Sequence, residues 1–317
     1  MTGLAKDCEI LQFGENAHDD DVIHQLRWCN SSLIFFLVFQ KCTEGQNKNT
    51  VLSPYSVGVA LAFAAQGAAG TTERKLFDGL HLTGTKEQIA DRFSESFAAL
   101  TRGVGNSTLE IANKVYVQEG HQIKPAFADV AEKKFHSEAQ SVNFGNNVQS
   151  AQTINQWVEE KTHDKIKDLI SADSLSADSR VVLVNAIYFK GQWEHQFRKT
   201  STQPGPFYTT ADGAPVDVQY MNQKEHFNYG AFEELQATGL QLKYQNSDIS
   251  FLIVLPDKRD GLAALEQKLQ NVDFGSLIGR MERQEVQVKI PKFKIESKFD
   301  LKEPLTKVSD SQVIGTS

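Results

Sequence analysis

The 317-residue sequence has little cysteine, little clustered positive charge and no apolar stretch of membrane-spanning length. Its three Cys, at positions 8, 29 and 42, fit no metal or redox spacing, and their odd number excludes a fully paired disulfide framework. The apolar run Leu33–Phe39 is too short to cross a bilayer. A net charge of -7 without a basic run argues against a general nucleic-acid binder. We therefore expect neither a membrane nor a nucleic acid as partner.

Sequence motifs for catalysis are also missing. No pair of His flanks a Glu at the spacing of zinc proteases, and no Gly-x-Ser-x-Gly elbow occurs. Gly103-Val-Gly105 lacks the length and the following helix pattern of a phosphate loop. Carboxylates are plentiful, but they are better explained as solvated surface than as an acid–base pair. We expect a non-enzyme with no catalytic residue, metal or cofactor.

The hydrophobic pattern predicts an α+β protein, because helices come first and strands with intervening helices follow. One continuous domain is expected, since no repeat or linker divides the chain. The predicted helices are 22–40, 54–66, 71–80, 88–100, 126–135, 154–170, 262–269 and 274–278. The predicted strands are 109–117, 142–144, 181–193, 216–220, 240–244, 249–255 and 286–297.

Val181–Trp193 is the organising stretch. It is apolar without alternation and rich in β-branched and aromatic residues, which favours a strand buried on both faces. Asn185 in its middle needs polar partners if it is buried. Asn113, in the alternating strand 109–117, is a second inward-facing amide. These side chains are expected to form a hydrogen-bonded cluster between helix and sheet.

The helix that begins at Ser53-Pro54 can supply the rest of that cluster. Ser53 is a suitable N-cap, and Pro54 loses no hydrogen bond in the first helical turn. The helix is small-sided and apolar, which predicts deep burial and makes Ser56 a buried hydroxyl. Separately, Asn30-Ser-Ser and Asn106-Ser-Thr match the acceptor motif for N-glycosylation, which matters only in a secreted chain.

With these residues in hand, the sequence resembles the serpin family. The resemblance rests on VLSPYSVGVALAFAAQGAAGTTERKL, LEIANKVYVQEG, INQWVEEKTHDKIKDLI, VNAIYFKGQWEHQF, ISFLIVLPDKRDGLAALEQKL and VKIPKFKIESKFDL, in the family's order. It extends from about Val22 to Leu305. It implies three mainly antiparallel or mixed β-sheets with about eight or nine helices. By the same resemblance, Ser53, Ser56 and Asn185 match the cluster that controls opening of the main sheet. Trp193 matches the Trp at its top, where the reactive loop enters.

The resemblance implies a serine protease inhibitor that traps its target by inserting a cleaved loop into the main sheet. After Val308 the sequence departs from the family pattern, and the expected bait loop is not found. The expected organisation is a divergent segment 1–21, an incomplete serpin-like domain 22–308 and a polar tail 309–317. We therefore expect a C-terminally truncated, non-inhibitory member. The alternative is a non-inhibitory binding or decoy protein, chaperone-like or a carrier.

The expected gap beside Val181–Trp193 leaves two alternatives for that strand. Val286–Ser297 slides over to pair with it, or it remains an open edge. An open edge predicts low stability, a strand-addition partner or self-association. Localisation is also divided: the resemblance favours an extracellular protein, whereas the acidic, polar residues 1–21 do not form a secretion signal and favour the cytoplasm.

Overall fold

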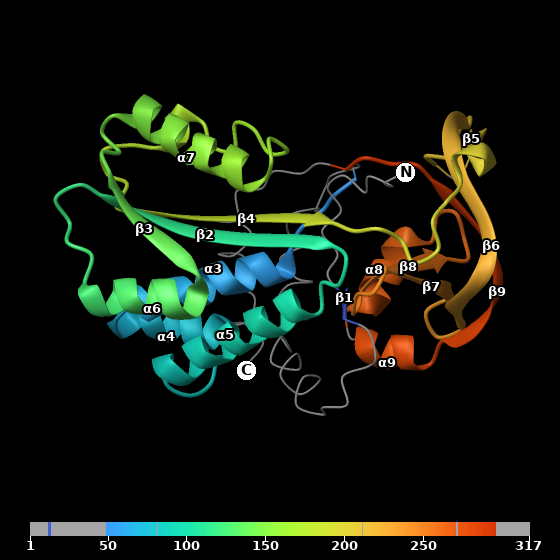
Figure 1. Cartoon of the computed structure of the whole chain (residues 1–317), viewed down its shortest axis with the longest axis horizontal. Helices are drawn as coiled ribbons and strands as arrows, with labels where there is room; N and C mark the ends of the chain where they lie inside the picture. The colour runs from blue at the N-terminus through green and yellow to red at the C-terminus, as the bar shows by residue number, and fades with distance from the viewer. Residues whose placement is uncertain (1–11, 14–48, 81, 211, 271, 296–317) are drawn as a thin grey trace.

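The computed structural model describes residues 12–13, 49–80, 82–210, 212–270 and 272–295, and these form two β-sheets with helices packed around them (Figure 1). The helices are α3 (Pro54–Gly67), α4 (Gly70–Gly79), α5 (Lys86–Arg102), α6 (Pro125–Phe135), α7 (Asn147–Lys161), α8 (Leu262–Leu269) and α9 (Phe274–Gly279). The strands are β1 (Gln12–Phe13), β2 (Thr108–Gln118), β3 (Ser137–Val142), β4 (Val181–Lys190), β5 (Gln203–Phe207), β6 (Val216–Phe232), β7 (Ala237–Lys243), β8 (Ile249–Pro256) and β9 (Glu282–Pro291). The predicted helix 22–40 lies outside the described residues.

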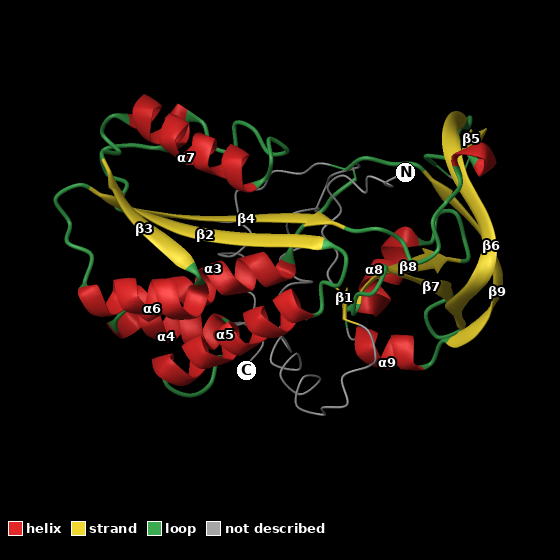
Figure 2. Ribbon diagram, viewed as in Figure 1, coloured by secondary structure: helices red, strands yellow, loops and turns green. Residues whose placement is uncertain are grey.

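The first sheet has the strand order β3-β2-β4 and lies between two helical layers. Helix α7 covers one face, and α3 to α6 cover the other (Figure 2). Along each strand, alternate side chains pack into two apolar cores, one on each face of the sheet. Tyr116 and Val184 pack with Trp157 of α7, whereas Val115 and Leu183 pack with Phe63 of α3. Both faces of this sheet are therefore covered by apolar packing, as the unbroken apolar runs predict.

The second sheet is built on the long strand β6. Strand β9 pairs with residues 220–229 along one edge of β6. Along the other edge, β5 pairs with residues 216–220 and β7 pairs with residues 228–232. Strand β8 continues from β7, and β1 pairs with β8. Through β6 these strands form one sheet, so the described strands make two sheets, where the resemblance implies three. The predicted α+β class is confirmed.

The amphipathic stretch 154–170 is only partly helical, which corrects its prediction as one helix. Helix α7 begins earlier, with Asn146 as its N-cap, and ends at Lys161. Beyond it, His163 and Asp164 have positive φ values of 50° and 60°, which a helix cannot contain. The Thr162 hydroxyl accepts the Ile166 N–H, so the chain turns away while Ile166 and Ile170 still pack against the core. The apolar spacing is therefore retained without the helix.

Three strand predictions also need correction. The strand predicted at 142–144 is β3, which begins at Ser137, and Phe144 lies just beyond it, fully buried. The strand predicted at 286–297 is β9 and ends at Pro291, where the ring removes a ladder donor. Strand β4 ends at Lys190, before Trp193, and its first residue Val181 is 56% exposed. Burial of β4 on both faces is therefore confined to its middle.

None of the helices in the described ranges combines the length and the apolar character needed to cross a membrane.

Candidate functional site

Strand β4 has one paired edge and one free edge among the described residues. It pairs antiparallel with β2 from Val181↔Val117 to Lys190↔Thr108, along all of its 10 residues. Strand β9 pairs with β6 and not with β4, so of the two alternatives the sliding of Val286–Ser297 is wrong for its described part. The free edge presents backbone N–H and C=O groups that another strand can bind. We call this row of groups, from Val181 to Lys190, the β4 edge.

An amide bridge ties β4 to β2 beneath this edge. Asn113 and Asn185 are register partners, and the Asn185 Nδ2 donates to the Asn113 Oδ1 at 2.5 Å. Asn113 is 3% exposed, and its own Nδ2 donates to the Phe135 carbonyl at the end of α6, at 3.2 Å. Both residues share the strand face of Val115 and Leu183, which is the face toward α3. The two amides that the sequence singled out thus meet and connect β4, β2 and α6.

The serines predicted for the same cluster begin α3. Ser53 is 6% exposed, and its backbone carbonyl accepts the Val57 N–H at 3.3 Å as the helix starts. Val59 and Phe63 of α3 pack on Leu183 of β4 and on neighbouring residues. The helix therefore lies on the Asn185 face of the sheet. The side chain of Ser56 lies outside the described part of the structure.

Trp193 lies just past the end of β4 and packs on the turn between β7 and β8. Its ring stacks on Tyr244, with centroids 4.5 Å apart and planes inclined by 14°. Phe189 of β4 meets the same tyrosine edge-on at 4.9 Å. Gly191 is needed here because a Cβ at this position would collide with the Tyr244 ring. Sequence reasoning identified Trp193 but missed Tyr244 and the role of Gly191. The close Gly-x-Trp spacing was the available signal.

On the α7 face, a charged cluster lies beside the core. Lys114 is 9% exposed and donates to Glu138 of β3 at 2.8 Å. Its ammonium lies 5.4 Å from the Tyr116 ring centroid and 5.5 Å from that of Trp157. The hydrogen bond from Lys114, reinforced by the charges of Lys114 and Lys161, lowers the pKa of Glu138. Burial, with a smaller contribution from Glu138, raises the pKa of Tyr116.

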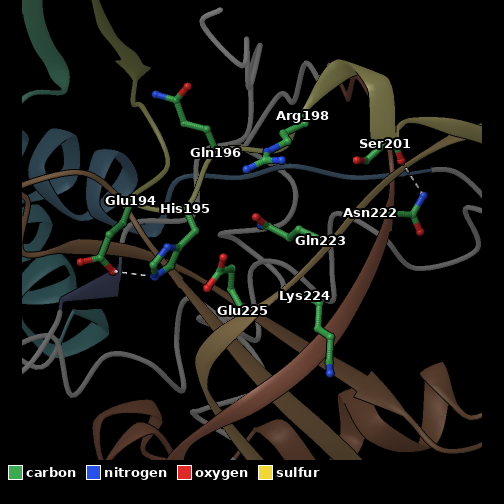
Figure 3. Close-up of a pocket in the computed structure, with 9 residues that line it drawn as sticks. All are labelled: Glu194, His195, Gln196, Arg198, Ser201, Asn222, Gln223, Lys224 and Glu225. Carbon is green, nitrogen blue, oxygen red and sulfur yellow. Dashed lines mark hydrogen bonds and ion pairs between the residues drawn. The ribbon is translucent and has the colours of Figure 1, made fainter.

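A polar pocket of about 430 Å³ lies between residues 194–201 and β6 (Figure 3). It lies along the stretch of the β6 edge that β5 and β7 leave uncovered. The His195 Nε2 is buried 3.9 Å from the nearest Glu194 oxygen, and neither it nor the buried Gln223 Nε2 has a hydrogen-bond partner among the described residues. In the described part of the chain, no cluster of three or more His, Cys, Asp or Glu side chains can hold a metal ion. The polar side chains that line this pocket are therefore suited to hydrogen bonding with a ligand.

Of the two glycosylation motifs, the one at Asn106 lies in the described part of the chain. Asn106 is exposed in the loop between α5 and β2. Asn30 lies outside the described residues.

Comparison with known proteins agrees with this architecture. Residues 30–314 match the family described as Serpin (serine protease inhibitor), so the chain belongs to the serpin family. It is 38% identical over 263 residues to Serine protease inhibitor 42Dd of Drosophila melanogaster, covering 83% of this chain and 69% of that protein. It is 35% identical over 300 residues to Alaserpin of Manduca sexta, covering 92% and 74%. Among solved structures, Cleaved Serpin 42Da superposes with a TM-score of 0.84 at 41% identity, covering 91% of this chain and 77% of that one.

Proposed function

We propose that this chain is the strand-accepting body of a serine protease inhibitor and that the β4 edge is its acceptor. The observation that carries the proposal is the pairing of β4 on one side only, among the described residues. An extended peptide that adds to such an edge satisfies backbone groups that otherwise bind water. Each backbone hydrogen bond contributes about 0.5–1.5 kcal/mol net, so a few of them suffice to hold a peptide in place.

The amide bridge supports this assignment. Asn185 lies in the middle of the acceptor strand, and its link through Asn113 to α6 holds β4 in register against β2. The family resemblance implies that this cluster controls opening of the main sheet beside the acceptor strand. A hydrogen-bonded polar cluster has discrete arrangements, and this makes it suited to control such a shift. Ser53 and Ser56 belong to the same proposal through their position at the start of α3.

Accepting a strand does not by itself make these 317 residues a protease inhibitor. The bait loop that the family resemblance places after Leu305 would lie beyond the described residues, so the geometry supports the acceptor half of the mechanism. From the sequence pattern after Val308, we propose that these 317 residues do not trap a protease. Mixing the chain with trypsin- and elastase-like serine proteases and looking for SDS-stable complexes tests this. A stable complex would contradict the non-inhibitory proposal and leave the acceptor edge in place.

A decoy or carrier role is the second candidate, and the β4 edge favours it as well. In this role, the β4 edge binds the loop of another serpin. Binding of a loop peptide from a full-length family member, without any effect of added protease, supports this role. If such a peptide binds no more tightly than a scrambled one, the decoy role is wrong.

The remaining parts of the proposal follow from the family. By family, the partners are serine proteases and the role is negative regulation of proteolysis, whereas the 317 residues themselves are proposed to be neither inhibitor nor enzyme. An extracellular location is proposed from the resemblance, with the cytoplasm as the alternative. Detection of the chain in culture medium, compared with cell lysate, decides between them.

A further inference from the structure

The loop between α5 and β2, together with the first residue of β2, carries the motif Asn106-Ser107-Thr108, which the proposed strand-accepting function does not use. The acceptor motif for N-linked glycosylation needs the Asn amide and the hydroxyl two residues later. A folded chain tolerates a sugar only where the Asn side chain projects into solvent.

The three residues alternate in exposure. Asn106 and Thr108 are exposed, whereas the Ser107 hydroxyl between them is buried. This alternation places the amide and the required hydroxyl on the solvent side and turns the middle residue inward. The Asn106 side chain makes no hydrogen bond with another described residue, so attachment of a sugar breaks no contact there.

The loop is held in place by its backbone, independently of the Asn106 side chain. The Asn106 N–H donates to the Gln245 carbonyl at 3.3 Å, and the Asp248 N–H donates to the Gly103 carbonyl at 2.8 Å. The Ser247 hydroxyl donates to the same Gly103 carbonyl at 2.8 Å. The turn between β7 and β8 thus holds the loop through backbone groups, and none of these contacts involves the Asn106 side chain.

We propose that Asn106 carries an N-linked glycan. In the reaction, a bond forms between the Asn106 Nδ2 and C1 of the first sugar of a lipid-pyrophosphate-linked oligosaccharide. The bond between C1 and the pyrophosphate oxygen breaks, the lipid pyrophosphate leaves with the bonding electrons, and the amide proton passes to a base. No oxidant or metal of this chain is needed.

The glycan lies at a defined place relative to the β4 edge. Thr108 pairs with Lys190, the last residue of β4. The turn between β7 and β8 also contacts the segment before Trp193, since the Gln245 N–H donates to the Gln192 carbonyl at 2.8 Å. The sugar therefore projects beside the end of the sheet that carries Trp193.

The test directs the full chain into the secretory pathway of insect cells behind a cleavable leader. The chain carries Asn30→Gln so that only one motif remains. Both the medium and the microsomal fraction are collected, so the result does not depend on release. Treatment with peptide N-glycosidase, which converts a glycosylated Asn to Asp, is followed by mass spectrometry of the peptide that contains position 106.

The expected result is conversion of Asn106 to Asp and a downward gel shift after enzyme treatment. Both are expected to disappear in Thr108→Val, which removes the required hydroxyl at nearly constant shape, and to persist in the matched control Ser107→Ala. The sugar-bearing chain and the Asn106→Gln chain are expected to melt at the same temperature. Recovery of unmodified Asn106 from the microsomal and secreted chain would overturn the proposal.

Discussion

Asn185 and Asn113 lie 72 positions apart in the sequence, yet the side-chain amide of one donates to the side-chain oxygen of the other at 2.5 Å. Asn113 passes the connection on to the Phe135 carbonyl at the end of α6. A strand, its neighbour and a helix are therefore linked by two consecutive hydrogen bonds. Because Asn113 is almost fully buried, removing one partner of the bridge leaves a buried polar group without its hydrogen bond and lowers the stability of the fold.

Replacing Asn185 with Ala is expected to destabilise the chain by about 1–3 kcal/mol, because the Asn113 Oδ1 loses its donor. Asn113→Ala is expected to cost at least as much, since the Phe135 carbonyl also loses its partner. Urea unfolding of both single variants and the double variant measures the coupling, expected at about 0.5–3 kcal/mol. The exposed Asn106→Ala is the control, expected within about 0.5 kcal/mol of the parent. Strict additivity of the two variants would contradict the bridge.

Gly191→Ala is expected to disrupt the packing of Trp193, because the added methyl group meets the Tyr244 ring. Overpacking of this kind costs about 1–3 kcal/mol. The near-UV circular dichroism of the Trp193–Tyr244 stack should change with it. The matched control is Gly275→Ala in α9, where the added Cβ makes only an ordinary contact with Asp273 at 3.5 Å. Equal effects of the two substitutions would refute the assigned role of Gly191.

Glu138→Gln is expected to lower stability at neutral pH by up to about 1 kcal/mol, in keeping with a partly exposed ion pair. The pKa of Glu138 is lowered in the folded state from its ordinary value of 4.5 by the Lys114 hydrogen bond. Its contribution is therefore present above about pH 4.5 and is lost as pH falls through the lower folded pKa. Thermal melts of parent and variant should converge in acid. Exposed Glu119→Gln serves as the control, and a difference that grows below pH 4 would contradict the assignment.

The β4 edge is expected to cause concentration-dependent self-association of the isolated chain. Val181, at the start of β4, is 56% exposed, so Val181→Lys places a charge at the edge without emptying the core. This variant should raise the monomer fraction in light scattering after gel filtration. Val216→Lys, at a valine that is 50% exposed on β6, should not. A parent chain that stays monomeric at all concentrations would contradict the prediction.

The sequence predicted those features that depend on local pattern. The cap and Pro54 located the start of α3, and the alternation around Asn246 located the hairpin of β7 and β8. Asn113 and Asn185 were identified as inward-facing because each interrupts an apolar strand. Their direct pairing was not predictable from periodicity, since it depends on the register between β2 and β4.

The failures have a common physical origin in long-range contacts. The apolar spacing of residues 154–170 is compatible with a helix, but the left-handed residues after Thr162 redirect the chain while the same side chains remain in the core. The contact of Tyr244 with Trp193 arises from a β-bridge between segments far apart in sequence. Such contacts are set by the packed fold and cannot be predicted from the local residue pattern of a single sequence.

The most direct test of the acceptor edge is hydrogen exchange of the chain with an acetylated ten-residue peptide of alternating Thr and Ala, matched to the 10 residues of β4. If the β4 edge accepts a strand, the β4 amides that face it become protected, while the β9 amides, already paired with β6, do not change. A charged control peptide of alternating Glu and Lys should give no protection. Protection that appears elsewhere, or none in β4 at saturating peptide, would contradict the account.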